Sequence, residues 1–149
     1  MRRLAFLCAL FAEAGFARAA GAPGAVTAID AAAVNAAFEK GLPLLETAAY
    51  KIHASRREAA GVGEVHVKDT DILYVLEGSA TLVTGGTLVD PKEVAPDEIR
   101  GSGIAGGETR EIAKGDVVIV PNGTPHWFQA VRPPVLYYVV KVTDLGAAK

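Results

Sequence analysis

The chain has 149 residues and a formal net charge of −2, and half of its residues are hydrophobic. This length suits one domain, and the hydrophobic share is enough to build a core. Basic residues are scattered and form no stripe, so the sequence lacks the electrostatic footprint of a nucleic-acid-binding protein.

Residues 1–19 have the three parts of a secretory signal peptide. A pair of arginines is followed by an apolar run over residues 4–12 and by the A-x-A cleavage signal Ala17-Arg18-Ala19. We therefore expect a periplasmic or secreted protein that has no membrane contact after processing. An amphipathic N-terminal helix of a cytosolic protein is the alternative. Because Cys8, the single cysteine, lies in this leader, the processed chain would have no thiolate chemistry.

Residues 20–49 form an N-terminal extension with a short helix. The helix is expected over 31–40, with Asp30 as its N-cap and with Gly41 and Pro43 ending it. A second short turn is expected over 43–49.

From residue 50 to the end at 149, the pattern changes to short β-type runs separated by turn residues. A long loop or loose hairpin, rich in Pro, Gly and charge, is expected over 89–107. The pattern predicts one all-β domain, a sandwich or barrel. The expected strands are 50–55, 63–67, 72–77, 80–84, 109–112, 116–120, 126–130 and 135–142.

Two segments carry the chemistry of this domain. The second of them has Gly115, Pro121, Gly123 and His126 in the spacing G-x5-P-x-G-x2-H, which resembles the second motif of the cupin family at every named position. In that motif a buried strand and a tight turn precede a strand that points the histidine into a barrel. The family often continues to an asparagine, where this chain has Ala130.

The first segment resembles the first cupin motif, H-x-H-x(3,4)-E-x6-G, with two substitutions. Counting back from Gly78 puts Asp71 at the glutamate position, His66 at the second histidine and Glu64 at the first. The two motifs together identify the chain as similar to small single-domain cupins, which implies a double-stranded β-helix, or jelly-roll, barrel over 50–149.

The resemblance implies one divalent metal ion held by His66, Asp71 and His126, with Glu64 as a fourth ligand or as the general base. Side chains alternate along a strand, so Glu64, His66 and Lys68 share one face of a regular strand. A set of two imidazoles with carboxylates suits Fe, Mn, Zn, Cu or Ni, and the added carboxylate favours Fe or Mn. Alternatively, the Lys68 ammonium replaces the metal charge in a metal-free pocket.

Further residues are candidates for the substrate pocket. Phe128 shares the face of His126, whereas Trp127 points away and is expected in packing or a dimer contact. His53 lies on the strand that precedes the first motif, where it faces a substrate or has a structural role. Tyr137 and Tyr138 cannot both face inward, and we place Tyr138 in the pocket.

The family resemblance implies a metal-dependent protein that acts on a small organic molecule by oxygenase, lyase or isomerase chemistry. The alternative is a non-catalytic pocket that binds a sugar or organic acid, with Lys68 holding an anionic group. A purely structural role is a third reading, and it leaves the converging polar residues unexplained. A homodimer paired through barrel edges is expected, because pairing protects exposed strands.

Overall fold

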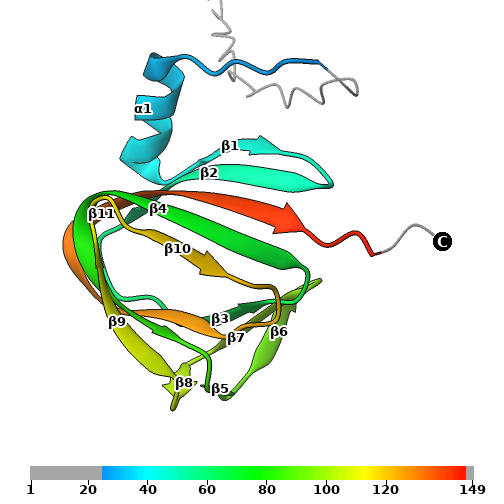
Figure 1. The fold of residues 1–149 in the computed structure, drawn as a ribbon, viewed down its shortest axis with the longest axis vertical. Helices are drawn as coiled ribbons and strands as arrows, with labels where there is room; N and C mark the ends of the chain where they lie inside the picture. The colour runs from blue at the N-terminus through cyan, green and yellow to red at the C-terminus, as the bar shows by residue number, and fades with distance from the viewer. Residues whose placement is uncertain (1–24, 147–149) are drawn as a thin grey trace, which may run out of the picture.

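The computed structural model describes residues 25–146 (Figure 1). The expected signal peptide at residues 1–19 lies outside the described residues. Helix α1 (Ala31–Lys40) has the expected bounds, with the Asp30 side chain accepting a hydrogen bond from the backbone N–H of Ala33. Among residues 25–146, no helix is long and apolar enough to cross a membrane.

The strands curl into a barrel, and α1 lies on its outer side (Figure 1). In the described part of the chain, nine strands form one antiparallel sheet, and β5 and β8 form a separate pair. This arrangement confirms the predicted all-β barrel. The strands are β1 (Pro43–Glu46), β2 (Tyr50–Arg57), β3 (Gly63–His66), β4 (Asp69–Thr84), β5 (Thr87–Val89), β6 (Lys92–Ala95), β7 (Glu98–Gly101), β8 (Gly103–Ala105), β9 (Glu108–Ala113), β10 (Val117–Val120) and β11 (His126–Thr143).

Two long strands, β4 and β11, each replace two predicted short ones. β4 continues through Gly78, whose φ of +76° bends the strand, and a Cβ at that position would lie 2.3 Å from the carbonyl oxygen of Pro134. β11 continues through Pro133 and Pro134, where its pairing register with β4 shifts. Proline lacks the N–H that a ladder needs, so this segment bends without ending the strand.

Two segments that were not predicted as strands contain strands in the structure. Residues 43–46 form β1, which pairs with β2 and extends the sheet, so this part of the predicted turn is a strand. The predicted long loop or loose hairpin over 89–107 contains the antiparallel β6–β7 hairpin, followed by β8, which pairs with β5. These strands have three or four residues, and all four residues of β6 are exposed, so they lack the alternating pattern of a half-buried strand.

The hydrophobic core fills the barrel, and most of its residues come from β4 and β11, with Ile112 of β9 and Val120 of β10. Leu82, Val75 and Val135 are its largest fully buried side chains. A second cluster on the outside joins Phe38 of α1 to Ala54 and Tyr138. Asp71 and His126 are the buried polar residues in the described part of the chain, so the barrel contains a polar site beside its apolar core.

Candidate metal and substrate site

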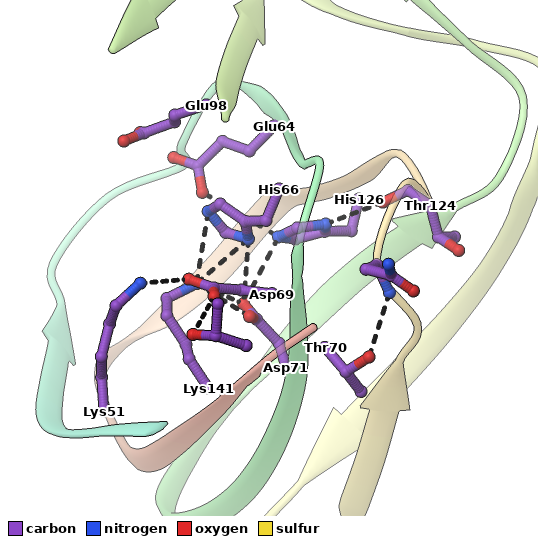
Figure 2. A network of polar contacts seen from close by, with 12 residues as sticks. Lys51, Glu64, His66, Asp69, Thr70, Asp71, Glu98, Thr124, His126 and Lys141 are labelled. Carbon is purple, nitrogen blue, oxygen red and sulfur yellow. Dashed lines mark hydrogen bonds and ion pairs between the residues drawn. The ribbon is translucent and has the colours of Figure 1, made fainter. Parts of the chain in front are cut away.

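Strand pairing brings the residues of the two sequence motifs together. His126, at the start of β11, is directly opposite Glu64 on β3. His66 lies two residues beyond Glu64 on the same strand, and Asp71 on β4 is opposite Lys141 on β11. Directly opposite residues on antiparallel strands have neighbouring side chains. Figure 2 shows these five side chains gathered in one network.

The donor atoms of Glu64, His66 and His126 lie within 4.8 Å of one another, close enough to hold one metal ion. The rings of His66 and His126 have centroids 5.0 Å apart. Asp71 Oδ2 lies 3.3 Å from His66 Nδ1 and 3.8 Å from His126 Nε2. The group within 4.8 Å therefore comprises Glu64, His66 and His126, and Asp71, also predicted as a ligand, lies beside the two histidines at the edge of this group.

A backbone contact fixes the orientation of the His126 ring. Its Nδ1 lies 3.1 Å from the carbonyl oxygen of Thr124, and this contact is a hydrogen bond only when Nδ1 carries the proton. Nε2 then has a free lone pair, which points toward Glu64 and Asp71. Burial lowers the pKa of His126 below 6.5, and the Thr124 carbonyl only partly offsets that effect. A neutral imidazole is the form that binds a metal.

Lys141 also lies inside this cluster, although neither sequence motif includes it. Its Nζ donates to both carboxylate oxygens of Asp71 at 2.8 Å and lies 3.0 Å and 3.3 Å from the two ring nitrogens of His66 (Figure 2). The sequence shows that Tyr137, Val139 and Lys141 share one face of a strand, but the register of β11 decides that this face is the inward one. A lysine in that series is a charge inside the barrel.

The Lys141 ammonium keeps Asp71 ionised. Burial raises the pKa of this carboxyl, but the hydrogen bond with His66 and the charge of Lys141 outweigh burial and lower the pKa from its ordinary 3.8. The cluster thus holds two carboxylates, those of Glu64 and Asp71, against one ammonium. With neutral imidazoles this leaves one negative charge, which the Arg100 guanidinium 3.9 Å from Glu64 offsets at the edge of the cluster. The nitrogen and oxygen donors of the cluster fit a divalent cation.

Lys68 does not reach the cluster. β3 ends at His66, so the regular alternation that would place Lys68 beside it is broken. The Lys68 side chain is 55% exposed and its Nζ lies 3.0 Å from Asp97 Oδ2. The ammonium that lies among the candidate ligands is that of Lys141.

A cavity of about 300 Å³ opens beside the cluster. His53, Phe128 and Tyr137 line it, and His53 also lies 3.1 Å from Glu46 Oε1. Tyr138 does not line this cavity, contrary to the sequence expectation, because α1 covers the outer face of β11 and the Tyr138 ring packs edge-on against Phe38. The full lining is His53, Ser55, Arg57, Glu64, His66, Asp71, Leu73, Glu98, Arg100, His126, Phe128, Tyr137, Val139 and Lys141.

Trp127 points away from the cavity, as the strand alternation predicts. Its indole N–H donates to the carbonyl oxygen of Gly61 at 2.9 Å. The ring also packs near Gly103, where an added Cβ would lie 3.4 Å from it. Trp127 therefore links β11 to the segment between β2 and β3 and to β8.

Comparisons with known proteins agree with the barrel fold. A search of curated proteins found no match. Among solved structures, the chain is similar to protein BH2720 of Bacillus halodurans, with 12% identity, 84% of this chain and 87% of that one covered, and a TM-score of 0.55. Protein NMB1881 of Neisseria meningitidis has 13% identity, 78% and 100% coverage, and a TM-score of 0.53.

An uncharacterised conserved protein with a double-stranded β-helix domain from Klebsiella pneumoniae has 18% identity, with 72% of this chain and 83% of that one covered and a TM-score of 0.50. At such identities the structural matches show the fold alone. The family model described as Cupin matches residues 19–149, which is most of the chain. The chain therefore belongs to the cupin family.

Proposed function

We propose that this cupin binds one divalent metal ion through Glu64, His66 and His126 and acts on a small organic molecule in the adjoining cavity. The observation that carries the proposal is the convergence of three donor groups within 4.8 Å. The His126–Thr124 contact supports it, since it leaves one imidazole nitrogen available for coordination. The cavity of about 300 Å³ suits a small ligand.

The side chains have separate roles in this proposal. A bound ion would supply Lewis acidity that polarises a substrate oxygen. His66 and His126 would hold it, and Glu64 would be a ligand or the base that takes a proton from the substrate. Asp71, already held by Lys141, would balance charge or complete the ligand set. Oxygen donors beside two imidazoles favour Fe or Mn over softer ions.

A metal-free pocket is the second candidate, and one observation favours it. The Lys141 ammonium lies 2.8 Å from both Asp71 oxygens and within 3.3 Å of both His66 ring nitrogens, so it already supplies a positive charge at the cluster. In this alternative Lys141, rather than the predicted Lys68, is the cation that organises the pocket. The protein would then bind an organic acid or sugar without catalysing a metal-dependent reaction.

Metal content distinguishes the two candidates. We expect near-stoichiometric metal by elemental analysis of protein purified without chelators, and its loss in His126→Ala, because that variant lacks one of three ligands. His53→Ala is the matched control, since His53 contacts Glu46 and is outside the ligand cluster. Wild-type protein that stays metal-free after incubation with Fe(II), Mn(II) and Zn(II) would favour the second candidate.

A further inference from the structure

Three basic side chains line the cavity, and they differ in their partners. Lys141 is paired with Asp71 at 2.8 Å, and Arg100 contacts Glu98 at 2.5 Å and Glu64 at 3.9 Å. Arg57 has no acidic partner within 4.0 Å among residues 25–146. A partly buried guanidinium without a carboxylate is costly unless another group satisfies it.

The Arg57 side chain is held in place by neutral groups. Its Nε donates to the hydroxyl oxygen of Tyr137 at 2.9 Å, and its guanidinium carbon lies 4.3 Å from the centre of the Phe128 ring. Gly61 lies close by, because a Cβ at that position would be 2.7 Å from a terminal nitrogen of Arg57. These contacts orient the guanidinium before any ligand arrives, which lowers the entropy lost on binding.

The segment that carries Gly61 is itself fixed to β11. The Gly61 N–H donates to the carbonyl oxygen of Phe128 at 2.9 Å, and the Gly61 carbonyl accepts from Trp127 Nε1 at 2.9 Å. Neither contact involves a charged group. The surroundings of Arg57 therefore fix its position and leave its charge uncompensated.

We propose that Arg57 binds a carboxylate group of the substrate, so that the substrate class is small organic acids. A guanidinium presents parallel N–H groups that match the two oxygens of a carboxylate. The cavity lining holds three acidic side chains, Glu64, Asp71 and Glu98, and three basic ones. Before metal binding the lining is thus balanced in formal charge, and the bound ion adds positive charge that favours an anionic ligand.

Tyr137 supplies a second donor at this subsite. Burial raises its pKa above 10, and the nearby Arg57 charge only partly offsets that rise, so the phenol keeps its proton. The Tyr137 oxygen accepts from Arg57 Nε and lies in hydrogen-bonding contact with the Ser55 side chain, so its own O–H can donate to Ser55 or to a ligand oxygen.

The identification of the bound acid as the substrate depends on the proposed metal site. Arg57 and the His66–His126 pair line the same cavity of about 300 Å³, so one small molecule can contact both. An acid anchored at Arg57 would direct its remaining atoms toward the metal ligands. Arg57 would be a binding residue that sets substrate specificity.

Binding of succinate, compared with its neutral analogue succinamide, tests this subsite by calorimetry on metal-free and Mn(II)-loaded protein. We expect succinate but not succinamide to bind both forms, and Arg57→Met to weaken binding roughly tenfold or more, because a hydrogen bond to a charged group is worth about 1.5–3 kcal/mol. Arg56→Met is the matched control, since Arg56 is the exposed neighbour on β2 and pairs with Glu58.

Arg57→Lys keeps the positive charge and most of the stem, so it is the second variant if Arg57→Met does not fold. We expect it to bind more weakly than the wild type, because it loses the paired N–H geometry. Unchanged succinate binding in the folded Arg57 variants, equal binding of succinamide, or no succinate binding in the millimolar range would overturn the subsite. We expect His126→Ala to lose the metal and still bind succinate. If the wild type never binds metal but binds succinate through Arg57, only the metal proposal is rejected.

Discussion

The two ends of the strand pair β4–β11 differ in what their inward side chains do. In the middle, Val75, Leu82 and Val135 are fully buried in the apolar core. At one end, Asp71 and Lys141 occupy inward positions of the same two strands and pair with each other. The same alternation thus produces a core where the inward residues are apolar and a polar site where they are charged.

The largest expected effect lies in the apolar part. Leu82→Ala should lower the free energy of unfolding by about 3 kcal/mol, because it removes a fully buried side chain and leaves a cavity. Urea unfolding measures this loss, and Leu145→Ala, at a position 67% exposed, is the control. Metal affinity of the folded Leu82 variant should be unchanged. A large loss of affinity would show that core and site are coupled.

Changing the charged end should affect stability and metal binding in opposite directions. Lys141→Met leaves the Asp71 carboxylate buried without its ammonium, which should cost the metal-free protein up to about 3 kcal/mol. Removing that positive charge should also raise divalent-metal affinity roughly tenfold, or about 1.4 kcal/mol.

Titration calorimetry and urea unfolding with and without Mn(II) measure both effects of Lys141→Met. Lys51→Met is the control, because Lys51 pairs with Asp69 outside the ligand cluster and is 30% exposed. Metal affinity that falls in Lys141→Met would mean that Lys141 supports the ion instead of competing with it.

The smallest expected effect is the response of the metal-free protein to pH. The pKa of His126 is lower in the folded chain than its ordinary 6.5, so the unfolded chain takes up this proton first and stability falls as pH drops below 6.5. The folded pKa of Asp71 is also lowered, below 3.8, so its contribution is present above 3.8 and is lost as pH falls through the folded pKa.

Unfolding free energies between pH 8 and pH 3 measure these two losses. His126→Gln should remove the loss that begins near pH 6.5 and keep the one at lower pH. If His126→Gln still loses unfolding free energy below pH 6.5, another group titrates there.

Much of the fold and part of the site could be predicted from the sequence. Local signals place α1 at Ala31–Lys40, where Asp30 caps it and Gly41 ends it in a left-handed conformation. The two motifs identify the cupin barrel and name Glu64, His66, Asp71 and His126, because their spacing reflects positions on strands and turns. Such features depend on neighbours in the chain, so the chain alone carries them.

The identity of the cation at the site and the direction of the tyrosines were decided by tertiary structure. Lys68 fails to reach the cluster because β3 ends before it, whereas Lys141 enters because β11 pairs it with Asp71. Tyr137 faces the cavity and Tyr138 faces α1 because β11 shifts its register after Pro134. A register shift of one residue reverses every later side chain, and its position depends on strands distant in the sequence.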